Sequence, residues 1–151
     1  GEIMKKSIQK IIDWTLNEIG MYSPEASEMV YNTGLAESGY RQLEQIKGPA
    51  IGFFQVEPAT MRDTWDNYIM YRQDLKSKLW ALGYDEENDS ERVMGSIILQ
   101  VVFCRLKYRR APQALPECGD LEEQARYWKR IYNSELGKGT VEHFMEACHG
   151  R

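Results

Sequence analysis

The residue whose type and placement most favour chemistry is Glu37. It follows Ala26 by eleven residues and Val30 by seven, so the three side chains share one face of a predicted helix. A carboxyl group on an apolar helix face loses water, and this desolvation raises its pKa. A carboxyl with a raised pKa can act as the general acid for a glycosidic oxygen near neutral pH. The alternative is that Glu37 lies just past the helix end and faces solvent.

Short motifs around and after Glu37 occur in a fixed order. They read Gly34-Leu35-Ala36-Glu37-Ser38-Gly39, Gly52-Phe53-Phe54-Gln55, Pro58-Ala59-Thr60, and finally Tyr132-Asn133 with Gly137. This set resembles the soluble lytic transglycosylase family, which has a goose-type lysozyme-like fold. That family carries Glu-Ser, then Gly-Leu-Met-Gln, then Ala-Tyr-Asn-Ala-Gly. Here Phe53-Phe54 replaces Leu-Met and residues 131–135 depart from the last motif, so the clear resemblance covers residues 30 to 62.

The resemblance implies that Glu37 is the single acid/base of a peptidoglycan-cleaving enzyme. It would protonate the glycosidic oxygen between N-acetylmuramic acid and N-acetylglucosamine, and then accept a proton from the muramyl 6-hydroxyl as a 1,6-anhydro ring closes. A hydrolytic muramidase is the alternative and needs a second carboxylate, about 6.5–9.5 Å away for inversion or about 5–5.5 Å for retention. Glu57 and Glu44 are the candidates nearby in the sequence.

Other residues of these motifs are candidates for holding the sugar chain. Gly52 would allow close approach of the backbone, and Gln55 could hydrogen-bond an N-acetyl group or a hydroxyl. Phe53 and Phe54 could offer apolar faces to sugar rings, whereas Trp65 fits a core stripe with Met61 and Ile69. Ser38 could orient the acid or cap the helix, Glu57 could face the cleft or favour a helix start, and Tyr132 could lie near the acid or in the core. The predicted substrate-binding set is Ser38, Gly52, Phe53, Phe54, Gln55, Glu57, Thr60, Tyr132 and Asn133.

Helical periodicity dominates the segments that must position these residues. Ser23-Pro24-Glu25, Pro58, Asp120 with Glu123, and Thr140 are helix-start signals, and residues 85–91 form a polar connector. From Val93 to Phe103 the chain is apolar almost all round, which is typical of a buried central helix. We expect a mainly α (α+β, lysozyme-like) domain over residues 1–151, with six to seven helices and an irregular loop or small β region near residues 38–56.

Composition excludes several classes of function. The 151 residues are 42% hydrophobic and 28% charged, with a net charge of −4, which argues against a dedicated nucleic-acid binder. Two histidines, His143 and His149, and three cysteines leave few ligands for a zinc hydrolase. Cys104 lies in the most apolar segment and has no histidine nearby in the sequence, so a Cys-His hydrolase is disfavoured. We expect neither a metal nor another cofactor.

The sequence also carries expectations about place and partners. No segment reaches the about 18–20 apolar residues of a membrane span, and Gln9, Lys10 and Asp13 interrupt the only candidate signal peptide. We expect a monomer, made in the cytoplasm, that acts on peptidoglycan strands at the bacterial cell wall, as a phage endolysin or a virion-associated lysin would. The alternative from another class is a non-catalytic virion or secretion-system protein that binds glycan.

Overall fold

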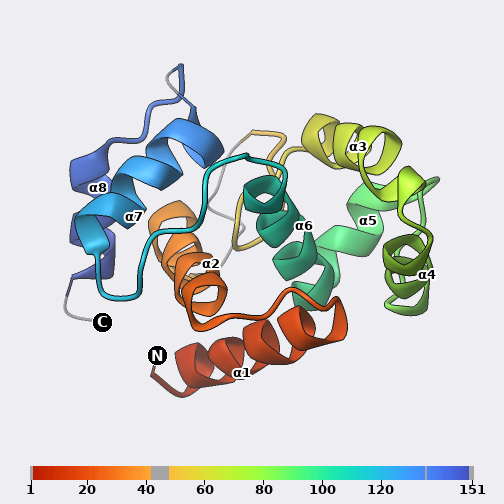
Figure 1. The fold of residues 1–151 in the computed structure, drawn as a ribbon, viewed down its shortest axis with the longest axis horizontal. Coiled ribbons are helices and arrows are strands. Elements are labelled where there is room, and N and C mark those ends of the chain that lie inside the picture. The colour runs from red at the N-terminus through yellow and green to blue at the C-terminus, as the bar shows by residue number, and fades with distance from the viewer. Residues whose placement is uncertain (1, 42–47, 135, 150–151) are drawn as a thin grey trace.

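The computed structural model describes residues 2–41, 48–134 and 136–149, and Figure 1 shows that their regular elements are helices. The mainly helical prediction is therefore confirmed: the described part holds eight α-helices and no strand. In order these are α1 (Glu2–Glu18), α2 (Pro24–Glu37), α3 (Pro58–Asn67), α4 (Gln73–Ala81), α5 (Asp89–Met94), α6 (Ile97–Arg109), α7 (Leu121–Tyr127) and α8 (Val141–Cys148). Two short turns join them, the 3-10 turn η2 (Ile69–Tyr71) and the π-helical turn η3 (Trp128–Asn133).

Side-chain caps begin three of the helices where the sequence signals predicted a start, α2, α7 and α8. Ser23 Oγ accepts a hydrogen bond from the Ala26 N–H at 3.0 Å, ahead of Pro24 at the first helical position. Asp120 and Thr140 accept equivalent bonds at the starts of α7 and α8, from the N–H groups of Glu123 and His143. Each bond satisfies one of the free donors of a first turn, which is why these residues mark helix starts.

The central helix begins later than the apolar run from Val93 to Phe103 and extends beyond it, to Arg109. Val93 belongs to α5, which starts at Asp89 inside the predicted connector and ends at Met94, with Gly95 as its C-cap. A new helix begins after Ser96, whose hydroxyl accepts the Leu99 N–H at 3.1 Å. The run therefore spans two helices, which are divided at Gly95 and at the capping Ser96. α6 is the buried one, with nine of its residues inaccessible.

Residues 48–56 form a tight turn rather than a sheet. Ile51 and Val56 make an isolated antiparallel bridge, with hydrogen bonds of 2.8 and 3.0 Å in the two directions. Gly52 and Gln55, inside this turn, both have positive φ, 78° and 51°. Residues 42–47, and with them the candidate Glu44, lie outside the described residues.

The helices pack around α2 and α6. Figure 1 shows α7 and α8 at one end, α3 to α5 at the other, and α1 running across beneath them; α1 contacts both α6 and α2, and α8 contacts α2. Trp65 is buried against Tyr84 and Trp80, and Cys104 is fully buried, so both are core residues as expected. Within the described ranges, no helix is long and apolar enough to cross a membrane.

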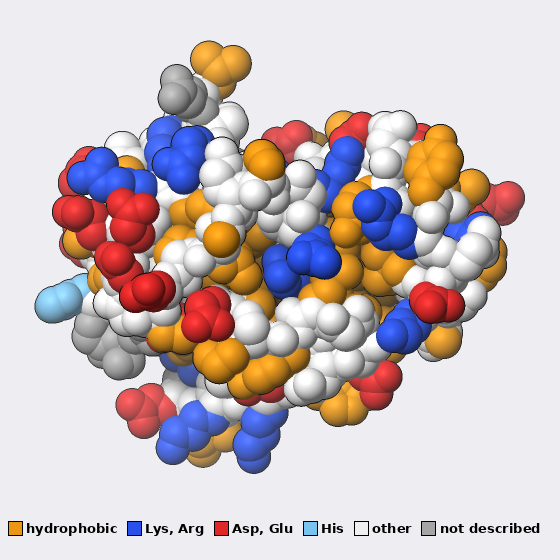
Figure 2. All heavy atoms as spheres, viewed as in Figure 1, with side chains coloured by type: hydrophobic (Ala, Val, Ile, Leu, Met, Phe, Trp, Pro, Cys, Tyr) orange, Lys and Arg blue, Asp and Glu red, His pale blue; other side chains and the backbone are white. Residues whose placement is uncertain are grey.

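Charge is unevenly distributed on the surface. Figure 2 shows acidic side chains gathered toward one end of this face, over α7 and α8, with Lys and Arg side chains beside them, and further Lys and Arg side chains in its middle, over α6. The acidic side chains are therefore not spread evenly over this face.

Candidate active site

Glu37 is the last residue of α2, and its carboxyl group is largely buried. Its Oε2 accepts a hydrogen bond of 2.9 Å from the indole Nε1–H of Trp128, which lies in η3. The side chain is thus held against the protein and does not extend freely into solvent. This placement agrees with the helical-face argument, since Ala26, Val30 and Thr33 of the same helix are fully buried.

Burial raises the pKa of the Glu37 carboxyl above its ordinary value. The Trp128 hydrogen bond opposes that rise because it favours the carboxylate, and Lys107 and His143 nearby lower the pKa further. The imidazole of His143 is fixed nearby, with Nε2 donating to the Ala36 carbonyl at 2.8 Å. The site thus favours the protonated acid and also stabilises the anion that forms when the proton leaves.

The packing around Trp128 fixes its indole. The side chain is 1% exposed and packs against Phe144, with ring centroids 5.4 Å apart. A side chain at Gly139 would lie 2.4 Å from the indole, so this glycine is required by close packing. In the sequence, Trp128 lies on an apolar stripe with Leu121, Ala125 and Tyr132, which is typical of a core residue and does not indicate a role at the site. A buried indole N–H needs an acceptor, which was the available signal.

Tyr132 connects its own motif to the motif of residues 52–55 and to α6. Its hydroxyl donates to the Phe54 carbonyl at 2.6 Å, and its own carbonyl accepts from Lys107 Nζ at 2.7 Å. The Lys107 ammonium also lies 4.5 Å from the centre of the Tyr132 ring. Tyr132 is a core tyrosine that also lines a pocket with Glu37. Lys107, one of several basic residues near the end of α6, lines the same pocket.

The space next to Gly52 is filled by the side chain of Gln100, not left open for a sugar. A side chain at position 52 would lie 2.4 Å from Gln100, whose Oε1 accepts the Phe53 N–H at 3.0 Å and whose Nε2 donates to Val93. Gly52 itself is buried. The glycine does allow a close approach, but the neighbour is a glutamine of α6 and not the sugar that we expected at this position.

The two phenylalanines of the turn do not present open ring faces. Phe54 is 0% exposed, so the expectation that its ring meets a sugar is wrong; the ring is part of the core. Phe53 is half-buried and packs edge-on against Tyr40, with centroids 5.6 Å apart. Gln55 lines a pocket together with Glu37, and its side-chain amide donates to the Gly52 carbonyl at 2.9 Å.

Three pockets near Glu37 share lining residues, and we refer to them together as the groove. The central pocket, about 380 Å³, is lined by Glu37, Ala50, Gln55, Glu57, Thr60, Lys107, Ile131, Tyr132, Asn133 and Ser134. The α8 pocket, about 470 Å³, is lined by Lys5, Leu35, Ala36, Glu37, Ser38, Gly39, Arg41, His143, Glu146 and Ala147. The distal pocket, about 380 Å³, is lined by Ala59, Thr60, Asp63, Thr64, Lys107 and Arg110. Glu37 is shared by the first two pockets, and Thr60 and Lys107 are shared by the central and distal ones.

The remaining candidates take distinct places in this groove. Ser38 caps α2, since its hydroxyl donates to the Gly34 carbonyl at 3.3 Å and accepts the Tyr40 N–H at 3.0 Å. Glu57 is exposed at the start of α3, makes no side-chain capping bond there, and lines the central pocket with Glu37. Asn133 lines the same pocket, and its Oδ1 accepts from Lys129 Nζ at 2.8 Å.

In the part of the chain that the structure describes, no group of three or more His, Cys, Asp or Glu side chains is arranged to hold a metal ion.

Comparison with protein-family models, with curated proteins and with solved structures gives no significant match.

Proposed function

We propose that the protein cleaves the β-1,4 bond between N-acetylmuramic acid and N-acetylglucosamine in peptidoglycan, by lytic transglycosylation, with Glu37 as the single acid/base. The observation that carries this proposal is a desolvated carboxyl shared by two adjoining pockets of one groove. A groove suits a polymer that extends past the reacting bond on both sides. The lysozyme-like identity of the helical fold is part of the proposal.

The chemistry follows from the two protonation states of Glu37. The protonated carboxyl donates its proton to the glycosidic oxygen as the bond from that oxygen to the muramyl C1 breaks. The resulting carboxylate then accepts the proton of the 6-hydroxyl, whose oxygen bonds to C1 and closes the anhydro ring. Trp128 and the charge of Lys107 stabilise the carboxylate between these steps. No water is consumed, and Glu37 ends protonated.

Hydrolysis by a muramidase is the second candidate, and Glu57 in the central pocket favours it. A second carboxylate could direct water to C1 in place of the 6-hydroxyl. Mass spectrometry of the products separates the two reactions, because an anhydromuramyl end is lighter by one water than a reducing end. We expect the anhydro product from the wild type and from Glu57→Gln.

The central experiment is clearing of a peptidoglycan suspension by wild type and by Glu37→Gln. We expect the wild type to clear it and the variant to lose about 10²–10⁴-fold in rate, as removal of a general acid does. Thermal stability should not fall, because a neutral amide in this buried place avoids the desolvation of a carboxylate. Glu86→Gln is the matched control, since Glu86 also accepts an indole N–H, from Trp80, but is exposed on the surface.

Equal clearing by Glu37→Gln would refute the site, and no clearing by the wild type would favour a non-catalytic glycan-binding protein of a virion or secretion system.

The proposed enzyme acts as a monomer at the bacterial cell wall after synthesis in the cytoplasm. The role of a phage endolysin or virion-associated lysin fits that setting.

A further inference from the structure

Two cations lie along one wall of the distal pocket, beside the proposed reaction centre. Lys107 and Arg110 are three residues apart at the end of α6, so their side chains project to the same side of the helix. Lys107 lines both the central and the distal pocket, and Arg110 lines the distal one. The two side chains therefore extend from the central pocket, which contains Glu37, into the distal pocket.

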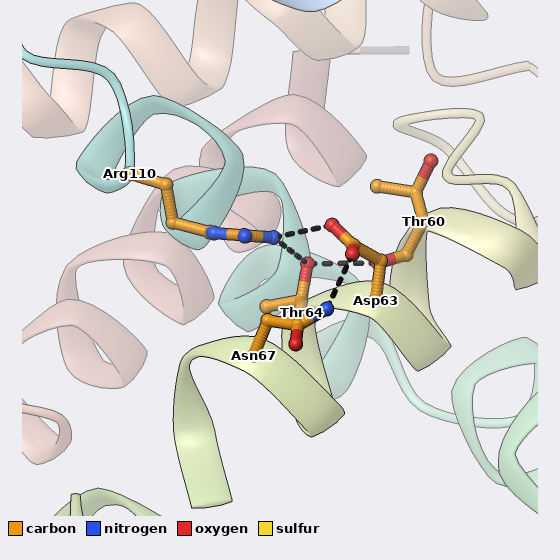
Figure 3. Close-up of polar contacts among 5 residues, drawn as sticks. All are labelled: Thr60, Asp63, Thr64, Asn67 and Arg110. Carbon is orange, nitrogen blue, oxygen red and sulfur yellow. Dashed lines mark hydrogen bonds and ion pairs between the residues drawn. The ribbon is translucent and has the colours of Figure 1, made fainter. Parts of the chain in front are cut away.

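Arg110 is held in place by α3. Figure 3 shows it reaching from the end of α6 toward Asp63 and Thr64, with Nη1 at 2.8 Å from Asp63 Oδ2 and 3.5 Å from Thr64 Oγ1. Asn67 donates to the other oxygen of Asp63 at 2.7 Å. Both bonds lower the pKa of the Asp63 carboxyl, so Asp63 stays ionised and keeps orienting the guanidinium.

Both cations keep donors free for a ligand. The bonds of Arg110 to Asp63 and Thr64 use only Nη1, so Nη2 and Nε have no acceptor among the described residues. Lys107 gives one N–H to the Tyr132 carbonyl, which leaves two on its ammonium without an acceptor in the described ranges. A fixed guanidinium beside an ammonium matches a carboxylate, because charge-assisted bonds to planar anions are the strongest that these groups form.

A peptidoglycan strand offers that anion beside its sugar backbone. The sugar rings are neutral, whereas each muramyl unit carries a lactyl-linked peptide stem whose residues bear carboxylates. We propose that the distal pocket binds a stem carboxylate through Lys107 and Arg110 while the sugar chain lies in the central pocket. This assignment rests on the proposed function, and it makes the peptide stem a determinant of substrate choice.

The test compares two soluble peptidoglycan fragments, one untreated and one whose stem carboxylates have been coupled to methylamine. Binding is measured by calorimetry on the Glu37→Gln protein, which leaves the fragments intact. We expect the untreated fragment to bind about fivefold more tightly, the effect of a partly exposed ion pair. Adding Lys107→Met or Arg110→Gln should bring the two dissociation constants together, whereas Arg109→Gln, an exposed neighbour outside the groove, should keep the preference.

Equal affinity of Glu37→Gln for both fragments would overturn the assignment, as would a loss of preference in Arg109→Gln as large as in the groove variants. The ratio of affinities separates a charge contact from a general loss of structure, which would weaken both fragments alike. Cleavage of the untreated fragment by the wild type is scored separately. Charge-dependent binding without cleavage would refute only the proposed function, and cleavage with equal binding of both fragments would refute only the pocket.

Discussion

At the scale of single residues, Glu37 is governed by opposing effects on one carboxyl group. Burial favours its neutral form, and the Trp128 hydrogen bond, with Lys107 and His143 nearby, favours its charged form. A general acid that must also accept a proton benefits from both, because it alternates between the two states in each turnover. The indole N–H is the one of these groups that bonds the carboxyl directly.

Replacing Trp128 with Phe should shift the alkaline limb of the pH–activity profile to higher pH. The indole bond stabilises the carboxylate, so its loss raises the pKa of Glu37 further, and the acid stays protonated to higher pH. The buried carboxyl also loses a partner, so unfolding free energy should fall by about 1–3 kcal/mol. The profile is measured as the initial clearing rate across pH, corrected for the folded fraction.

Trp80→Phe is the matched control for this change. Trp80 also donates its indole N–H to a carboxylate, Glu86 Oε1 at 3.1 Å, but it is exposed on α4. It should leave the profile unmoved, and a shift toward lower pH in Trp128→Phe would contradict the account of Glu37.

Of Glu37 and its hydrogen-bond partner Trp128, the sequence predicted only Glu37 as a site residue. Glu37 was found because its helical face is local information, fixed by spacings of seven and eleven residues. Trp128 lies 91 residues further along the chain, and nothing in its own spacing distinguishes it from a core residue. Lys107 was likewise hidden among the basic residues of a helix end, because its contact with Tyr132 depends on how α6 meets η3.

At the scale of elements, the turn of residues 51–56 is held against α6 by one glutamine. Gln100 accepts the Phe53 N–H and donates to the Val93 carbonyl at 2.9 Å, so it joins the turn to the junction of α5 and α6. Gln55 and Glu57, which follow in the chain, line the central pocket. The turn therefore positions one wall of the groove.

Substituting Gly52 with Ala should lower the free energy of unfolding by about 2–4 kcal/mol, through positive φ and through overpacking against Gln100. Its φ is 78°, and a methyl group there would lie 2.4 Å from the Gln100 side chain. Clearing activity should fall with it, since the turn must move. Chemical denaturation measures the stability difference.

Gly20→Ala serves as the control for the backbone component alone. Gly20 has a similar φ of 69°, but nothing lies within 4 Å of the added methyl group. This substitution should lower the free energy of unfolding by only about 1–2 kcal/mol, the strain of an alanine in the left-handed conformation. Equal losses in the two variants would show that the contact with Gln100 is not restrictive.

The sequence predicted where several helices begin, but it did not predict where one helix gives way to the next. Ser23, Asp120 and Thr140 act within one helical turn of themselves, so their capping role follows from the local sequence. The division between α5 and α6 at Gly95 runs against a continuous apolar pattern. The π-helical geometry of residues 128–133 likewise leaves no trace in a 3.6-residue period, although it presents Trp128 and Tyr132 to the site.

At the scale of the whole molecule, the groove is assembled from segments that are far apart in the chain. Its lining comes from α1, the end of α2, the turn before α3, α3 itself, the end of α6, the η3 turn and α8. Each segment reaches its place through core packing on α2 and α6. An extended ligand would therefore contact elements from both ends of the fold and link them, whereas α4 lies outside these pockets.

Binding of a glycan fragment to Glu37→Gln should consequently slow amide hydrogen exchange in a discontinuous set of segments. We expect protection at residues 50–60 and 128–134 and at the ends of α2 and α6, with α4 (Gln73–Ala81) unchanged as an internal control. The unfolding free energy should rise by about 2.7 kcal/mol at a ligand concentration one hundred times the dissociation constant, because the ligand binds only the folded state. Exchange is followed by mass spectrometry of peptides with and without the fragment. Protection confined to one segment, or centred on α4, would contradict a continuous groove, since a polymer that spans adjoining pockets must hold their walls together.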